Sequence, residues 1–195
     1  MILIALCLVF LLGLMAAGGR VSDLAQIKIR RGWLAPLAFL MQAYLIFVPA
    51  ETAGGLLSSR SLILIVSNCL LFVVIWQNRE LEGVKLIGLG LLLNFVVIVL
   101  NGGFMPITPE ALIQTGHDSY APQLETGYRV ARTKNVILEP GETRLWFLSD
   151  ILILPRPFPI PSAVSVGDLV IAAGVFFFLR AAMFSKAPLS LTQTR

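Results

Sequence analysis

The sequence is poor in charged residues and in cysteine, and both shortages point away from a soluble protein. Charged residues make up 13% of the 195 residues and hydrophobic residues 57%, whereas soluble domains are about 25% charged. The two cysteines, Cys7 and Cys69, lie in apolar stretches, where a thiol behaves as a small hydrophobic side chain. A disulfide framework is excluded, and a soluble enzyme, a nucleic-acid-binding protein and a disordered chain fit poorly. The composition predicts an integral membrane protein.

Five apolar stretches have the length that a helix needs to cross a bilayer. A bilayer core about 30 Å thick takes roughly 20 helical residues, with about 17 to 25 workable. The stretches are 2–18, 33–48, 61–76, 84–100 and 164–179. We therefore predict an all-α integral membrane fold with five transmembrane helices. The first stretch has no basic residue before it, which favours an uncleaved span over a secretory signal sequence.

Basic residues predict the orientation of these spans, because Lys and Arg near span ends favour the cytoplasmic side. Four lie in 19–32, two in 77–85 and three after residue 179. The other side has Arg60 in a short loop and five basic residues in a long loop, which translocates largely regardless of charge. We expect a bacterial cytoplasmic (inner) membrane protein with its N-terminus outside and its C-terminus inside.

The segment before the last stretch differs in composition, since eight of the eleven prolines and the only histidine lie in 102–163. Two short apolar runs, 135–138 and 144–148, flank a Pro-Gly turn and predict a short β-hairpin. Alternating prolines at 155–161 favour an extended strut, or simply a rigid linker. We expect a four-span part (1–101), this proline-rich extracytoplasmic segment (102–163), and the fifth span with a cytoplasmic tail (164–195).

Two carboxylates on the outer side are candidate catalytic groups. Asp168 lies at the outer start of the fifth span, where a carboxylate that faces lipid is costly. Asp150 precedes the proline-rich run. Two carboxyl groups that approach closely can perform acid–base chemistry, because like charges near each other move their pKa values apart. Each also has a structural interpretation, since Ser165 and Asp168 can cap the helix and Asp150 can be a solvated loop residue.

Asn94, Asn101 and His117 are candidate binding residues. Asn94 and Asn101 are seven residues apart and so lie on nearly the same helix face, where both could line a groove that opens outward. Mid-helix amides at Gln42, Asn68 and Asn94 more often pack helices together through hydrogen bonds. His117 has no other ligands at metal spacing, and the sequence has no glycine-rich phosphate loop. We expect no metal site and no nucleotide site, and the sequence assigns no cofactor.

The strings NGGFMP at 101–106, RLWFLSD at 144–150 and SVGDLVIAAG at 165–174, with the proline-rich run, resemble a family of small bacterial membrane proteins that is known only as a domain of unknown function. This resemblance implies a multi-span protein and no particular activity. Asp168, Ile171 and Gly174 have the spacing found in the last span of lipoprotein signal peptidase, an intramembrane aspartyl enzyme, which they resemble. That resemblance implies Asp168 as one catalytic carboxylate, with Asp150 the nearest candidate for the second. The Gly-Asn-x-x-Asp-Arg element of that family is absent here, and that family has four spans.

Two functions follow as hypotheses. The first is a small accessory or scaffold subunit that associates with a larger membrane complex, because no complete catalytic set is evident. The alternative is a membrane-embedded aspartyl-type hydrolase that uses Asp150 and Asp168 at the outer membrane border, with Asn101 orienting the substrate. The expected partners are membrane lipids and a membrane protein or a second copy of the chain, and not nucleic acid. Transport is disfavoured because no span carries an internal charge.

Overall fold

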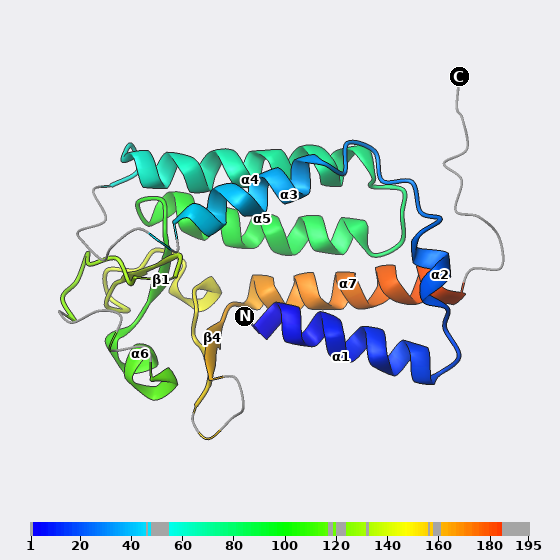
Figure 1. Cartoon of the computed structure of the whole chain (residues 1–195). Coiled ribbons are helices and arrows are strands. Elements are labelled where there is room, and N and C mark those ends of the chain that lie inside the picture. The colour runs from blue at the N-terminus through cyan, green and yellow to red at the C-terminus, as the bar shows by residue number, and fades with distance from the viewer. Residues whose placement is uncertain are drawn as a thin grey trace.

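The computed structural model describes residues 2–45, 47, 55–116, 119, 124–131, 133–155, 157 and 161–184. In this part of the chain, long helices run side by side in the spatial order α3, α4, α5, α7, α1 (Figure 1). They are α1 (Ile2–Ala16), α3 (Leu34–Tyr44), α4 (Ser59–Gln77), α5 (Val84–Leu100) and α7 (Val166–Phe184). Two short helices, α2 (Val21–Leu24) and α6 (Pro109–Thr115), lie at opposite ends of this bundle.

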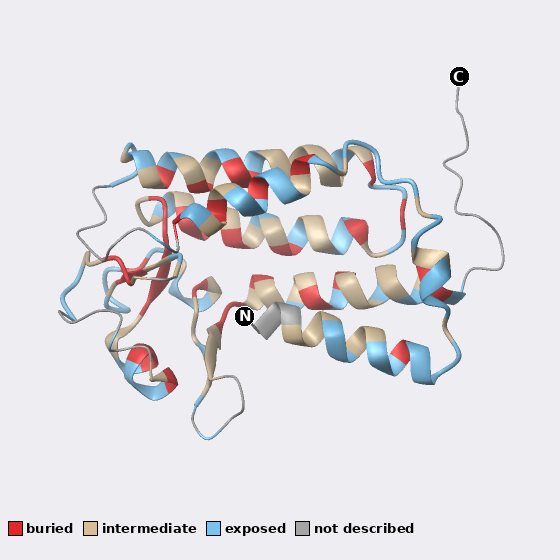
Figure 2. Ribbon diagram, in the orientation of Figure 1, coloured by how far each residue is buried: buried red, intermediate tan, exposed pale blue. Residues whose placement is uncertain are grey.

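Two of the helices, α4 and α7, are long and apolar enough to cross a membrane, judged by length and composition. The helices α1, α3 and α5 are apolar but shorter. Only 22% of the apolar window of α4 and 28% of that of α7 is buried, so most of their side chains are at least partly exposed (Figure 2). The prediction of a helix over 84–100 is confirmed with the same bounds, and every other predicted stretch contains a helix.

Short strands gather at the end of the bundle opposite α2 (Figure 1). β1 (Met105–Ile107) pairs in parallel with β2 (Asn135–Ile137). β3 (Leu152–Leu154) pairs antiparallel with β4 (Ser162–Val164), which leads directly into α7. The first pair is buried because its apolar side chains join three clusters, around Leu112 of α6, Leu64 of α4 and Val97 of α5. These clusters attach the strand end to the helices.

The predicted hairpin between 135–138 and 144–148 is wrong. The first run forms β2, which pairs with β1, and the second forms a 3-10 helix, η2 (Trp146–Leu148). Burial explains the difference, since Val136 and Ile137 are almost fully buried while Trp146 and its neighbour in η2 stay half exposed. The first run therefore gains more by pairing with the buried strand β1.

The predicted strut or rigid linker at 155–161 falls largely on residues 156 and 158–160, which lie outside the described part of the chain. The strands on either side of it pair with each other in antiparallel register, with Leu154 opposite Ser162.

Glycines bring α5 and α7 into close contact. A Cβ added to Gly90 would lie 2.5 Å from the carbonyl oxygen of Gly167. Seven residues along each helix, a Cβ added to Gly174 would lie 2.8 Å from the carbonyl oxygen of Gly83. Because the glycines recur at the same interval in two antiparallel helices, the close approach extends over about two helical turns. This approach sets Asn94, one turn beyond Gly90, against the start of α7.

Candidate functional site

A hydrogen-bonded network joins α5 to the start of α7. Asn94 Nδ2 donates to Asp168 Oδ1 over 2.8 Å, and Ser165 Oγ donates to Asn94 Oδ1 over 2.7 Å. Ser165 Oγ also accepts from the backbone nitrogen of Asp168 over 3.0 Å, and Asp168 Oδ2 accepts from the backbone nitrogen of Ser165 over 3.4 Å. This reciprocal pair caps the start of α7. Asp168 therefore caps α7 with Oδ2, while its Oδ1 accepts a hydrogen bond from Asn94 of α5.

Asp150 is held at the same end of the bundle by the first pair of strands. Asn135 Nδ2, at the start of β2, donates to Asp150 Oδ2 over 2.7 Å. The pKa of Asp150 is raised to about 7, mainly by burial and further by the negative charge of Asp168. The hydrogen bond from Asn135 and the positive charge of Lys134 act in the opposite direction. A carboxyl group with this pKa is partly protonated at neutral pH.

Lys134 adds a positive charge to the two carboxylates. Its Nζ donates to Gln42 Oε1 over 3.0 Å, and Gln42 Nε2 donates in turn to Ser67 Oγ over 3.0 Å, which links the strand end to α3 and α4. Although part of its surface is exposed, the protein around Lys134 desolvates its ammonium group. This desolvation lowers the pKa of Lys134, while the charges of Asp168 and Asp150 raise it.

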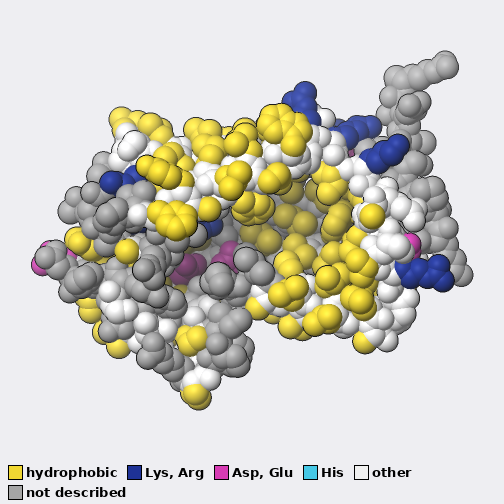
Figure 3. All heavy atoms as spheres, in the orientation of Figure 1, with side chains coloured by type: hydrophobic (Ala, Val, Ile, Leu, Met, Phe, Trp, Pro, Cys, Tyr) yellow, Lys and Arg dark blue, Asp and Glu magenta, His cyan; other side chains and the backbone are white. Residues whose placement is uncertain are grey.

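The three charged groups lie within electrostatic reach of one another. Asp168 and Lys134 act on the pKa of Asp150, and both carboxylates act on that of Lys134; Asp150 and Asp168 are partly buried and Lys134 is exposed. Figure 3 shows acidic and basic side chains together in a hollow between the helices and the strand end. In such a cleft a partly protonated carboxyl group can donate a proton, an ionised one can accept a proton, and an ammonium group can stabilise a developing negative charge.

Of the predicted binding residues, Asn94 joins this cluster and Asn101 has other partners. Asn101 Nδ2 donates to the carbonyl oxygens of Val97 and Arg144, and its Oδ1 accepts from the backbone nitrogen of Arg144. These bonds close the end of α5 and fix the chain before η2, which is a structural role. His117 lies outside the described residues. In the described part of the chain, no group of three His, Cys, Asp or Glu side chains could hold a metal ion.

The sequence interpretation missed Lys134 and Asn135, which bind Gln42 and Asp150. The available signal was weak: a Lys-Asn pair directly before an apolar run, at 134–135, and a mid-helix amide at Gln42. The amide prediction is confirmed for Gln42 and Asn94, which bond across elements. Asn68 instead donates to the carbonyl oxygen of Leu64 in its own helix.

Comparison with known proteins places the chain in a family but adds no activity. A protein of Thermotoga maritima described as uncharacterized is 24% identical over 172 residues, which cover 87% of each chain. No solved structure matches this chain. These matches do not confirm the local resemblance to lipoprotein signal peptidase. The sequence model of a family of unknown function (DUF5317) matches residues 26–180, and the chain belongs to this family.

Proposed function

We propose that α1, α3, α4, α5 and α7 all cross the bacterial cytoplasmic membrane, with the N-terminus outside and the C-terminus inside. Large apolar side chains on the outward faces of these helices support this, for example Leu12, Leu40 and Leu92, which are 47% to 68% exposed. Contact with lipid would cover such a surface. Most Lys and Arg side chains visible in Figure 3 gather at the end of the bundle that holds α2, as expected of a cytoplasmic side.

At the outer end we propose acid–base hydrolysis by an aspartyl-type mechanism. One observation carries this proposal: Asp150, whose pKa is raised to about 7 by burial, lies near enough to Asp168 for the negative charge of Asp168 to raise that pKa further. Two carboxyl groups in different protonation states are what general acid and general base catalysis require. The substrate class is an acyl compound, such as a peptide amide, that reaches the outer membrane border.

The residues take distinct roles in this mechanism. Asp168 accepts a proton from the attacking water, while Asp150 donates its proton to the carbonyl oxygen of the substrate. When the tetrahedral intermediate collapses, one of its hydroxyl protons returns to Asp150, the carbon–nitrogen bond breaks, and the amine leaves with the proton that Asp168 had taken. Asn94 and Ser165 orient Asp168 through their hydrogen bonds. Lys134 stabilises the negative charge that Asp150 carries after it has given up its proton.

The proposal is tested with the full chain in detergent micelles and a library of fluorogenic peptide amides. Asp150→Asn and Asp168→Asn should each lower hydrolysis by at least about 100-fold, because each removes one proton-transfer step. Glu142→Gln is the matched control, since Glu142 is an exposed carboxylate in the same outer segment, and it should leave the rate unchanged. An active double variant, with both aspartates replaced, would contradict the proposal, as would a wild-type chain that hydrolyses no member of the library.

An accessory or scaffold subunit is the second candidate function, and the aromatic side chains of η2 favour it. Trp146 and Phe147 are 54% and 50% exposed, and their ring centroids lie 6.3 Å apart. Exposed aromatic pairs of this kind often anchor protein interfaces. Purification at native expression should then yield a membrane-protein partner in fixed ratio, which is lost in the Trp146→Ala, Phe147→Ala variant. A monomeric particle without a partner would contradict this candidate.

A further inference from the structure

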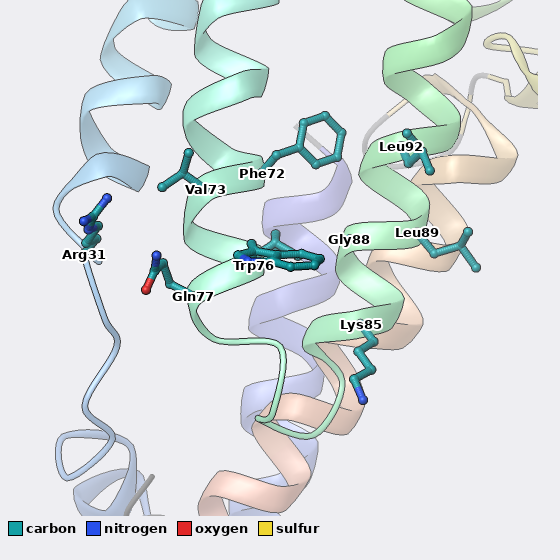
Figure 4. A pocket seen from close by; sticks show the side chains of 10 residues that line it. Arg31, Phe72, Val73, Trp76, Gln77, Lys85, Gly88, Leu89 and Leu92 are labelled. Atoms are coloured by element: carbon teal, nitrogen blue, oxygen red, sulfur yellow. The ribbon is translucent and has the colours of Figure 1, made fainter. Parts of the chain in front are cut away.

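An open apolar groove lies between α4 and α5, near the end of the bundle that holds α2 (Figure 4). Its volume is about 700 Å³. Its apolar lining includes Phe72, Val73, Trp76, Gly88, Leu89 and Leu92. Gly88 forms the floor, because a Cβ added there would lie 2.6 Å from Cγ2 of Ile75 on the opposite helix. The groove is therefore shallow at Gly88 and apolar along both helices.

Basic side chains stand at one end of the groove. Arg31 and Lys85 belong to its lining, and in Figure 4 they flank the end where Trp76 and Gln77 lie. The guanidinium carbon of Arg79 lies 4.5 Å from the centroid of the Trp76 ring, but Arg79 is paired with Glu80 over 3.5 Å. In the part of the chain that the structure describes, neither Arg31 nor Lys85 forms an ion pair, so these two residues supply the uncompensated positive charge at this end.

We propose that this groove binds one anionic phospholipid. An acyl chain lies along Phe72 and Leu92, and the phosphate meets Lys85 and Arg31 at the charged end. Charge complementarity selects this occupant, because a basic pocket between helices at the cytoplasmic side fits an anionic headgroup. An apolar partner helix would fill the groove but would leave two cations without a counter-charge. The proposal rests on the proposed membrane location and is independent of the acid–base site.

Trp76 provides a local test, since its ring lies in the groove (Figure 4). The variant Trp33→Phe, Trp146→Phe keeps Trp76 as the only tryptophan. It is placed in phosphatidylcholine vesicles that contain a small fraction of either brominated phosphatidylglycerol or brominated phosphatidylcholine. Bromine quenches tryptophan on contact, so we expect phosphatidylglycerol to quench Trp76 at a concentration lower by about fivefold for each basic residue engaged.

Charge variants identify the binding residues. Arg31→Gln with Lys85→Gln should remove the preference for phosphatidylglycerol, whereas Arg20→Gln should keep it, because Arg20 lies at the same end of the bundle but outside the groove. Equal quenching by both lipids, or a preference that survives in the double variant, would overturn the proposal. So would the absence of quenching by either lipid, which would mean that lipid does not reach Trp76.

Native mass spectrometry of the wild-type chain gives a second measurement that needs no tryptophan replacement. After incubation with equal amounts of phosphatidylglycerol and phosphatidylcholine, one phosphatidylglycerol should remain bound, and Asp150→Asn should retain it equally. Loss of the preference in wild type would overturn the lipid site without affecting the proposed hydrolysis. Absence of hydrolysis in a wild-type chain that still binds phosphatidylglycerol would overturn the proposed hydrolysis without affecting the lipid site.

Discussion

Asn94 of α5 donates a hydrogen bond to Asp168 of α7 over 2.8 Å, and its own amide oxygen accepts one from Ser165. One amide thus satisfies two polar groups at the start of α7. The contact depends on the close approach of the two helices at Gly90 and Gly167. Helix packing and the orientation of a candidate catalytic carboxylate are therefore set by the same interface.

Replacing Asn94 by Ala should lower the free energy of unfolding by about 1–2 kcal/mol, because Asp168 and Ser165 each lose a hydrogen-bond partner. Denaturant unfolding in micelles measures this loss. Asn68→Ala is the matched control and should cost less, since the described bond of Asn68 is to a carbonyl oxygen of its own helix. Equal losses in the two variants would show that the contact of Asn94 with α7 adds nothing to the free energy of unfolding.

Gly90→Ala should destabilise the bundle by about 1–3 kcal/mol, because the new methyl group overlaps the backbone of α7 and forces the helices apart. Gly13→Ala in α1 provides the comparison, as no atom lies within 4 Å of a Cβ at that position. It should be neutral or slightly stabilising, since Ala favours a helix more than Gly does. Thermal unfolding in micelles separates the two, and a neutral Gly90→Ala would contradict the close packing.

The raised pKa of Asp150 predicts a pH dependence of stability. The folded-state pKa of about 7 lies above the unfolded value of 3.8, so the folded chain binds the proton more tightly. The resulting stabilisation is fully present below about pH 4 and is lost as the pH rises through 7. Unfolding of wild type and Asp150→Asn at several pH values from 4 to 8 should show this loss in wild type alone. Parallel pH curves would contradict the raised pKa.

Lys134→Met should move the pH profile of hydrolysis. The positive charge of Lys134 lowers the pKa of Asp150, so removing it raises that pKa and keeps Asp150 protonated to higher pH. The upper limb of the profile should shift towards alkaline pH even as the maximal rate falls. Lys85→Met removes a charge at the other end of the bundle and should leave the limb in place. An unchanged upper limb in Lys134→Met would contradict an effect of Lys134 on the pKa of Asp150.

The helices were predictable because long apolar stretches act locally, and the range 84–100 matches α5 at both ends. The strands were not, since each has three residues, too few for a periodic pattern, and β1 pairs with a strand that is 30 residues away. Asp168 could be predicted as a site residue because it lies at the start of an apolar helix. Lys134 could not, because only the non-local pairing of β2 with β1 brings it near the two carboxylates.

The protonation state of Asp150 tests the central claim most directly. Infrared spectroscopy of the full chain follows the carbonyl stretch of a protonated carboxyl group as the pH is raised. The signal should disappear with a midpoint near pH 7 and be absent in Asp150→Asn. In Asp168→Asn the midpoint should fall, because the charge that raises the pKa of Asp150 is gone. A midpoint near the ordinary value of an aspartate in wild type, or one that Asp168→Asn does not move, would contradict a coupled acid–base pair.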